Sequence, residues 1–220
     1  MFDSIGLAKF LKAVLYLNAA LAIALATDFF GLLPDVPYVS AASISVITVS
    51  ALVFVIGQTA LFPKLCRLPG MWRLFPNIDG EYEVEISSNW SVIKARNEGR
   101  EPEVSSDGDV ALFNRVGKAT IMARLTRIDM SLTMDDGYLT SETVTCSLRR
   151  DRGERRPVLF YIYESHVSAP KNTDSDRHLG AARVTIPLER RPKVLEGNYW
   201  TDRNWHLGLN TAGRIRLRRV

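Results

Sequence analysis

The sequence has few of the residues on which most enzyme and metal sites depend. Its 220 residues include two cysteines and three histidines, and no two histidines have the spacing of metal ligands. It also has no GxSxG nucleophile motif and no glycine-rich phosphate loop. These absences exclude a zinc knuckle and the common hydrolase motifs, so we predict a binding protein, not an enzyme, with no metal and no cofactor.

Long runs of one charge are also missing. The net charge is +4, and the basic residues after Pro63 form short clusters that we interpret as solvated faces, with no DNA or RNA polymer as partner. Two carboxylate pairs, Asp135–Asp136 and Asp174/Asp176, lie in turn-rich stretches. Because such stretches are usually exposed, we interpret both pairs as solvated turns.

Charge is nearly absent between Ala13 and Phe62, where Asp28 and Asp35 are the only charged residues. A membrane-spanning helix needs about 20 apolar residues. The sequence therefore predicts a two-helix transmembrane hairpin over residues 1–63, with spans at about 10–33 and 38–62. A cleaved signal peptide is the alternative for the first span. It would leave the second span at the new N-terminus, an odd arrangement.

Positive charges flank the hairpin on both outer sides, and none lies in its connecting loop. Lys9 and Lys12 precede it, and Lys64, Arg67 and Arg73 follow it. The positive-inside rule then places the N-terminus and the C-terminal domain in the cytoplasm, with the hairpin in the inner-membrane bilayer. Residues 64–76 are predicted to be an interfacial linker.

The second span is rich in small residues that allow another helix to approach closely. These residues are Ser40, Ala41, Ala42, Ser43, Ser45 and Ser50. Asn18 and Gln58 lie at membrane depth, and either an interhelical hydrogen bond within the hairpin or a contact between protomers would satisfy them.

Alternation of period two dominates residues 77–220. In Glu81–Ile86, Tyr82, Val84 and Ile86 share one face and three glutamates the other. Seven further runs read as strands, at 118–126, 128–134, 139–149, 157–165, 179–188, 194–201 and 214–220, with no helical stretch between them. We predict an all-β domain, a small closed antiparallel barrel or a sandwich, with polar loops at Glu98–Gly108 and Ser168–Arg177 that could rim a barrel mouth.

The C-terminal segment Leu195–Leu217 concentrates aromatic and polar residues. On a strand, Tyr199, Thr201 and Arg203 share one face and Trp200 and Asp202 the other. Arginine with neighbouring hydroxyls suits a phosphate, and an aromatic ring suits a stacked base. A barrel closure with an Arg–Asp pair and core aromatics explains the same residues equally well.

The sequence resembles the two-transmembrane, β-strand-rich effectors of bacterial cyclic-oligonucleotide antiphage systems (CBASS). The resemblance spans nearly the whole chain, from the hairpin through IDGEYEVEISSNW at Ile78–Trp90 to LEGNYWTDRN at Leu195–Asn204. The C-terminal block is the most specific, and it matches the family pattern in order at Gly197, Tyr199, Thr201, Arg203, Thr211 and Gly213. The sequence departs from the pattern at Ala123/Arg124, where the family has a glutamine.

The resemblance implies a barrel that binds a cyclic dinucleotide made by a partner cyclic-oligonucleotide synthase. Binding would drive homo-oligomerisation through the hairpin, disruption of the inner membrane and abortive infection. The ligand residues that it implies are Tyr82, Trp90, Arg124, Ser141, Tyr161, Tyr163, His178, Thr201, Arg203 and Asn204. Tyr82 could equally be a core residue, and His178 an exposed turn residue. A membrane-tethered barrel that binds lipid or acts as a scaffold is the alternative function.

Overall fold

Two long helices precede the barrel. The computed structural model describes residues 7–27, 37–151, 153 and 156–220. Helix α1 (Leu7–Ala26) and helix α2 (Tyr38–Gln58) are both long and apolar enough to cross a membrane. Three predictions fall on residues outside the described ranges. They are the end of the first predicted span from Asp28 onward, the hairpin loop with Asp35, and the turn at Arg152.

Small side chains hold the two helices together. Ala41, Ser45 and Val49 are buried on one face of α2, which packs against α1, whereas Ser43 and Ser50 are exposed. Of the two alternatives for Asn18 and Gln58, the interhelical hydrogen bond is wrong, and a contact between protomers stays a prediction. Asn18 Nδ2 donates to Val14 O of its own helix at 2.9 Å, and Gln58 Nε2 donates to Thr126 Oγ1 in the barrel at 2.7 Å.

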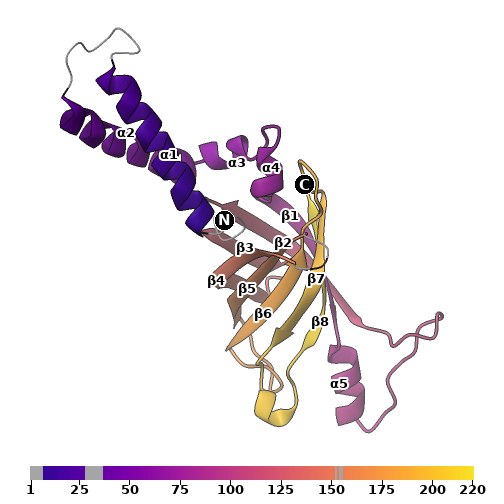
Figure 1. Cartoon of the computed structure of the whole chain (residues 1–220). Coiled ribbons are helices and arrows are strands. Elements are labelled where there is room, and N and C mark those ends of the chain that lie inside the picture. Colours follow the sequence, from indigo (N-terminus) through magenta and orange to yellow (C-terminus); the bar gives the residue numbers. More distant parts are fainter. Residues whose placement is uncertain (1–6, 28–36, 152, 154–155) are drawn as a thin grey trace.

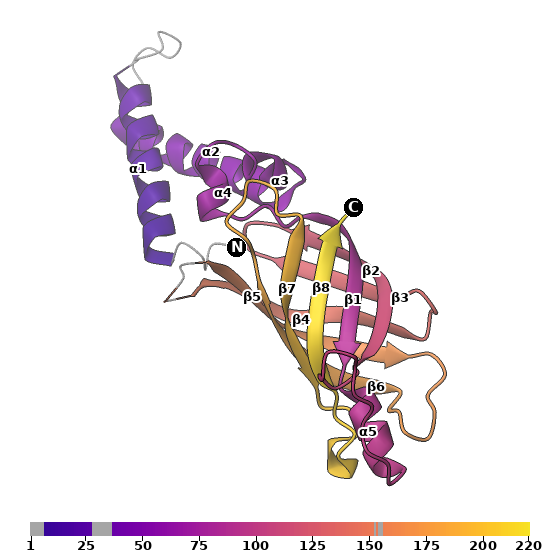
Figure 2. The same cartoon turned by 90° about the vertical axis from the view of Figure 1, so that its right-hand side faces the viewer.

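The domain after the hairpin is the closed antiparallel barrel that the sequence predicts. Its strands are β1 (Gly80–Ser88), β2 (Phe113–Ala123), β3 (Ile128–Met134), β4 (Leu139–Arg150), β5 (Pro157–Val167), β6 (Arg177–Thr185), β7 (Val194–Thr201) and β8 (Ala212–Arg219). Each strand pairs with the next, and β8 returns to pair with β1, so the strands of this sheet have no free edge (Figure 2).

Two glycines of the C-terminal block are explained by this closure. A Cβ atom on Gly213 would lie 1.9 Å from Ser87 O on β1, and one on Gly197 would lie 1.9 Å from Arg183 O on β6. A Cβ atom cannot lie this close to a carbonyl oxygen. The neighbouring strand therefore comes this near only because each position is glycine.

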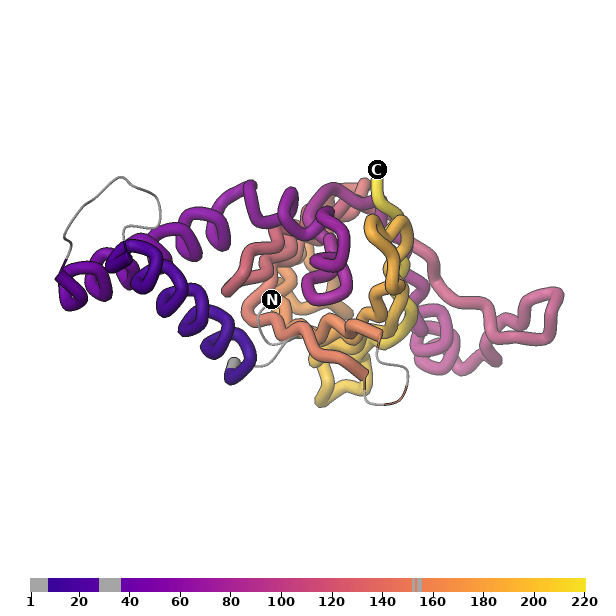
Figure 3. The backbone as a smooth tube through the Cα atoms, turned by 45° about the horizontal axis from the view of Figure 1, so that its top comes forward, coloured from indigo at the N-terminus to yellow at the C-terminus, as the bar shows by residue number. Residues whose placement is uncertain are grey.

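The prediction that no helix interrupts the strands is wrong. Helix α5 (Trp90–Asn97) follows β1, and it projects with the loop after it on the side of the barrel opposite to α1 and α2 (Figures 1 and 3). A 3-10 turn (Trp205–Leu207) also separates β7 from β8. A helix of eight residues and a turn of three are too short to give a recognisable periodic pattern of apolar residues, so the sequence did not predict either element.

The barrel has two unlike ends. At the helix end, where β1 begins, the short helices α3 (Leu61–Leu65) and α4 (Met71–Leu74) cover the strands (Figure 1). The C-terminal turn of α2 also contacts this end, because the carbonyl of Gly57 accepts a hydrogen bond from Leu125 N at 2.8 Å. The opposite, open end is formed by the loops at 89–112, 135–138, 168–176 and 202–211.

The hydrophobic core fills the helix end of the barrel. Phe62 of α3 and Phe75, which follows α4, pack edge to face and join the core with Ile78. Val84, Ile121 and many other inward side chains continue this core along the strands. Among the described residues, the interior of the barrel is therefore solid near the helices, and the cavity inside it lies toward the open end.

Candidate ligand-binding site in the barrel

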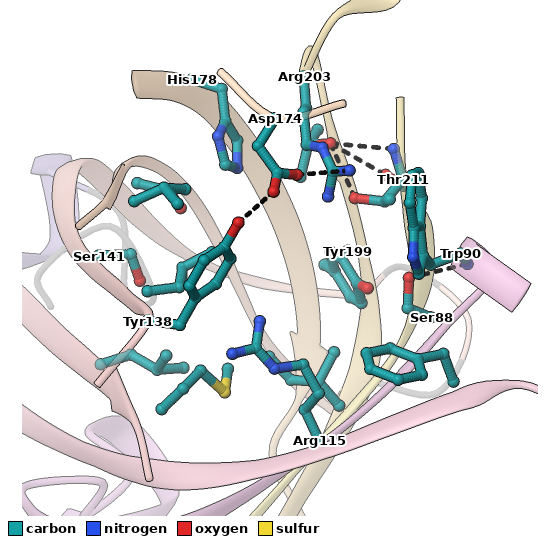
Figure 4. Close-up of a pocket in the computed structure, with 18 of the residues that line it drawn as sticks. Ser88, Trp90, Arg115, Tyr138, Ser141, Asp174, His178, Tyr199, Arg203 and Thr211 are labelled. Carbon is teal, nitrogen blue, oxygen red and sulfur yellow. Dashed lines mark hydrogen bonds and ion pairs between the residues drawn. The ribbon is translucent and has the colours of Figure 1, made fainter. Parts of the chain in front are cut away.

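A cavity of about 700 Å³ opens at the open end. Side chains from all eight strands and from α5 line it. Its lining toward the helix end is an apolar floor that includes Met130, Leu132 and Ile215. Its rim is polar and charged, with Arg115, Asp174 and Arg203 among the side chains there (Figure 4). Sites for small molecules commonly have this size and this combination of apolar wall and few polar groups.

Arg203, which follows β7, lies at the rim in a buried ion pair. Its Nη2 is 2.7 Å from Asp174 Oδ1, and the two side chains are 16% and 8% exposed. Tyr138 donates its hydroxyl hydrogen to Asp174 Oδ2 on the other side (Figure 4). Asp174 is therefore an internal counter-ion and not a solvated turn residue, so that interpretation of the sequence is wrong.

A second arginine, Arg115 on β2, lines the same cavity. Its Nη2 lies 2.7 and 2.6 Å from the two carboxylate oxygens of Asp136 in the β3–β4 turn. The Asp136 side chain is 58% exposed, as the solvated-turn interpretation predicts. The pKa of Asp136 is lowered, first by the hydrogen bond from the Tyr138 backbone amide and then by Arg115.

Each arginine lies over an aromatic ring. The guanidinium carbon of Arg203 is 4.4 Å from the Trp90 ring centroid, and that of Arg115 is 5.4 Å from the Tyr138 ring centroid. Both distances are within the range of cation–π attraction. Lys94 and Lys171 also line the cavity, but the two arginines are the cations that lie against flat rings on which a planar ligand group can stack.

Three further tyrosines line the wall. Burial raises the pKa of Tyr161, Tyr163 and Tyr199, so their hydroxyls are neutral donors and acceptors at physiological pH. Gly180 makes room for one of them, because a Cβ atom there would lie 2.3 Å from the Tyr163 ring. The cavity therefore offers neutral hydroxyls on its wall and cations at its rim.

The C-terminal segment is fixed by hydroxyl contacts at the rim. Thr201 Oγ1 lies 3.0 Å from Thr211 Oγ1, and the Thr211 amide donates to Thr201 Oγ1 at 3.1 Å. These bonds join the end of β7 to the residue before β8. The two threonines that match the family pattern thus close the loop that carries Arg203.

Three polar atoms beside the ion pair have no hydrogen-bond partner among the described residues. They are His178 Nδ1, Ser175 Oγ and Arg203 Nε. Burial lowers the pKa of His178, and the nearby Arg203 cation lowers it further, so the imidazole is neutral near pH 7. His178 and Arg203 line the cavity, and since buried polar atoms are rarely left unpaired, their two nitrogens mark the edge of a site for a polar ligand group.

The cavity brings together seven of the ten predicted ligand residues. These are Trp90, Ser141, Tyr161, Tyr163, His178, Thr201 and Arg203. His178 is 9% exposed, so the exposed-turn alternative for it is wrong. Whether these seven residues bind a ligand stays a prediction.

The other three predicted ligand residues lie outside the cavity. Tyr82 is a core residue at the helix end, where its hydroxyl donates to Ile78 O, and Arg124 pairs with Asp79 there at 2.7 Å. Asn204 adopts φ +40° and donates to Thr173 O at 3.0 Å, so it shapes a loop. Because Arg124 lies at the solid end, the departure from the family pattern there does not touch the cavity.

Sequence reasoning missed several cavity residues. Arg115, Tyr138 and Asp174 were not among the predicted ligand residues, although all three line the cavity. Alternation could have placed Arg115 near the start of β2, but no local signal pairs it with Asp136, 21 residues later. Among the residues that the structure describes, no group of three His, Cys, Asp or Glu side chains could hold a metal ion.

Comparison with known proteins gives one named relative. A protein from Escherichia albertii named CD-NTase-associated protein 15 is 36% identical over 59 residues, which cover 27% of this chain and 30% of the relative. The chain therefore matches less than a third of that relative's length. No protein-family model matches the sequence. The fold and this relative fit the CBASS effector family that the sequence resembles.

Proposed function

We propose that the chain is an antiphage effector whose barrel binds a cyclic dinucleotide and whose hairpin then assembles with copies of itself in the inner membrane. The observation that carries the proposal is the cavity with two arginines, Arg115 and Arg203, and aromatic rings beside both. A cyclic dinucleotide has two phosphodiesters and two flat bases, which match two cations and stacking surfaces.

The family resemblance supports a nucleotidyltransferase as the source of the ligand. The relative's name associates that protein with a CD-NTase, and the proposal extends this association to the present chain. The site is proposed to bind and not to catalyse. The three carboxylates that line it, Glu98, Asp136 and Asp174, are each paired with an arginine, and its buried tyrosines are neutral.

The proposal places both termini in the cytoplasm. The cavity lies at the end of the barrel away from α1 and α2, so it would face the solution on the side of the membrane where the barrel lies, and a soluble messenger is made in the cytoplasm. The loop between the helices has Asp35 and no lysine or arginine, which agrees with an outer position.

The proposed output is a population shift toward an assembled state. A ligand moves such an equilibrium only by its difference in affinity for the two states. The exposed face of α2 carries Ser43 and Ser50, small residues that would let helices of different protomers approach closely. Clustering of these helices would disrupt the bilayer and kill the infected cell.

A lipid-binding barrel is the second candidate, and the apolar floor of the cavity favours it. An acyl chain would fill the apolar floor, but it has no anionic group that the two rim arginines could bind. A pure scaffold has less support, because a cavity of about 700 Å³ is not needed for it.

The proposal is tested on the full-length chain in detergent micelles by isothermal titration calorimetry. The probes are 3′,3′-linked cyclic di-AMP, cyclic di-GMP and cyclic GMP–AMP, with a linear dinucleotide as the negative control. We expect one cyclic probe to bind and Arg203→Ala to weaken it at least about tenfold. Arg216→Ala, an exposed arginine on the outer wall, is the matched control.

Two results would contradict the proposal. One is the absence of binding by all three probes, and the other is co-purification of a lipid that fills the cavity. A separate measurement addresses the output: the bound probe should release dye from liposomes that contain the protein, and unliganded protein should not.

A further inference from the structure

Arg203, the cation best placed for a phosphate, is already occupied in the structure. Its partner Asp174 is 2.7 Å away and almost fully buried. A carboxylate and a phosphodiester are both oxyanions that seek the same guanidinium hydrogens. Two such anions side by side in a buried site would repel each other.

Asp174 reaches this position from the β5–β6 loop, residues 168–176, and the loop is tied across the mouth. Asn204 Nδ2 donates to Thr173 O at 3.0 Å, and Arg203 Nη2 donates to the same carbonyl at 3.3 Å. The hydroxyl of Tyr138 holds the second carboxylate oxygen. The start of the loop is held by Ser168, whose amide and hydroxyl donate to Tyr138 O at 3.1 and 3.3 Å. The rest of the loop is attached to the rim through Asp174 and its neighbour Thr173.

The counter-ion of the second arginine, Arg115, does not attach a loop to the rim in this way. Asp136, the partner of Arg115, lies in a short turn and is mostly exposed, so it can turn into solvent without moving the backbone. Asp174 is buried, and it can leave Arg203 only if its loop moves. The two counter-ions thus differ in what their displacement does to the chain.

We propose that Asp174 is a tethered competitor for the ligand phosphate and that ligand binding releases the 168–176 loop. This inference rests on the proposed function. The incoming phosphodiester replaces the carboxylate on Arg203, so one anion is exchanged for another and the cation stays paired. Two buried nitrogens of cavity residues that stay in place, His178 Nδ1 and Arg203 Nε, have no partner among the described residues and become available to the ligand as the loop leaves.

The exchange has a functional consequence. A tethered carboxylate has a high effective concentration at the arginine, so it lowers the apparent affinity for any phosphate ligand. It therefore sets a threshold of messenger below which the loop stays bound to the rim. Release of the loop changes the surface of the open end only when that threshold is passed.

The test compares three full-length proteins in micelles by calorimetry with the cyclic dinucleotide that wild type binds. Asp174→Asn keeps the shape of the side chain and removes the competing charge, so we expect about tenfold tighter binding, or about 1.4 kcal/mol. Asp176→Asn is the control in the same loop, because its carboxylate accepts only from the adjacent Arg177 amide, and it should bind as wild type does.

The outcomes separate this inference from the proposed function. Equal or weaker binding by Asp174→Asn, with wild type still binding, would show that Asp174 positions Arg203 and does not compete. No binding by either protein would overturn both the inference and the proposed function.

A second measurement uses wild type alone and does not depend on how the variant folds. Hydrogen exchange of the peptide that covers residues 168–177 should become faster when the cyclic dinucleotide saturates the protein. Exchange that is unchanged or slower would mean that the loop stays on the rim or closes over the ligand, and the inference would be overturned.

Discussion

The indole ring of Trp90 covers the guanidinium of Arg203, with 4.4 Å between the ring centroid and the guanidinium carbon. Trp90 is the first residue of α5, and its backbone amide donates to Ser88 Oγ at 3.2 Å. The helix that alternation missed is therefore the element that brings an aromatic ring to the key arginine.

Removal of this ring should weaken ligand binding without unfolding the barrel. We expect Trp90→Ala to lower cyclic dinucleotide affinity by about 5- to 30-fold, because the stacking and cation–π contacts of this ring together contribute roughly 1–2 kcal/mol to binding. Trp90→Phe should recover part of the loss. Trp205→Ala is the control, since that indole is 71% exposed and does not line the cavity. Calorimetry that shows equal affinity for Trp90→Ala would remove Trp90 from the site.

Much of the fold could be predicted from the sequence because local patterns determine it. The strand bounds 128–134 and 194–201 agree with β3 and β7, since each strand alternates cleanly between turn residues. The two apolar segments predicted the long helices for a similar reason: a run of some 20 uncharged residues has few other structures. Eight consecutive antiparallel strands then leave few arrangements other than closure.

The candidate site could be predicted only in part, because it is assembled by loops. The pairing of Asp174 with Arg203 joins residues 29 positions apart across two strands, and neither neighbourhood signals it. Tyr82 shows the opposite error. It has the residue type of a nucleotide contact and an inward position, but its strand enters the barrel at the solid end. Position along the barrel axis, which alternation does not report, decides between core and site.

Arg219 should be a main support of the helix end. Its guanidinium donates to Asn77 O at 2.7 Å, Asp79 O at 2.5 Å and Tyr82 Oη at 2.6 Å, and its Nε donates to Pro192 O. Arg219→Met would leave these buried acceptors unpaired, so we expect a loss of about 2–4 kcal/mol in the free energy of unfolding. Denaturant titration of the full chain measures it.

The matched control for Arg219 is Arg216→Met on the same strand. Arg216 pairs with Glu196 and Glu85 on the exposed outer wall, where ion pairs contribute less than about 1 kcal/mol. Similar unfolding free energies for the two variants would contradict the idea that Arg219 is a main support of the helix end.

The two faces of α2 should respond differently to enlargement. Ser43→Leu and Ser50→Leu add bulk on the exposed face, so we expect ligand affinity to remain and toxicity to fall. Ser45→Leu adds bulk where the side chain is 1% exposed, against α1, and should disturb the hairpin itself. Viable counts after phage infection, with membrane levels matched by immunoblot, measure the effect. Full killing by both outer-face variants would exclude this face as the assembly surface.

The neutral, buried state of His178 predicts a pH dependence of stability. Burial and then Arg203 lower its pKa in the folded chain, while Asp202 and Asp174 oppose the shift. Above about pH 6.5, the ordinary histidine pKa, both folded and unfolded imidazoles are neutral, so the group has no effect on stability. Below that pH the unfolded chain takes up the proton first, and the folded state loses free energy relative to it, by up to about 1.4 kcal/mol per pH unit.

Thermal unfolding of the full chain between pH 7.5 and 5 tests this sign. Acidic groups also titrate in this range, so the measured quantity is the difference between wild type and His178→Gln, with His206→Gln on the exposed 3-10 turn as control. We expect wild type to lose stability more steeply than His178→Gln as the pH falls. A parallel slope for the two proteins would mean that the cavity already accepts a charged imidazole. An anionic ligand beside His178 should reverse the wild-type behaviour, because its charge favours the protonated ring.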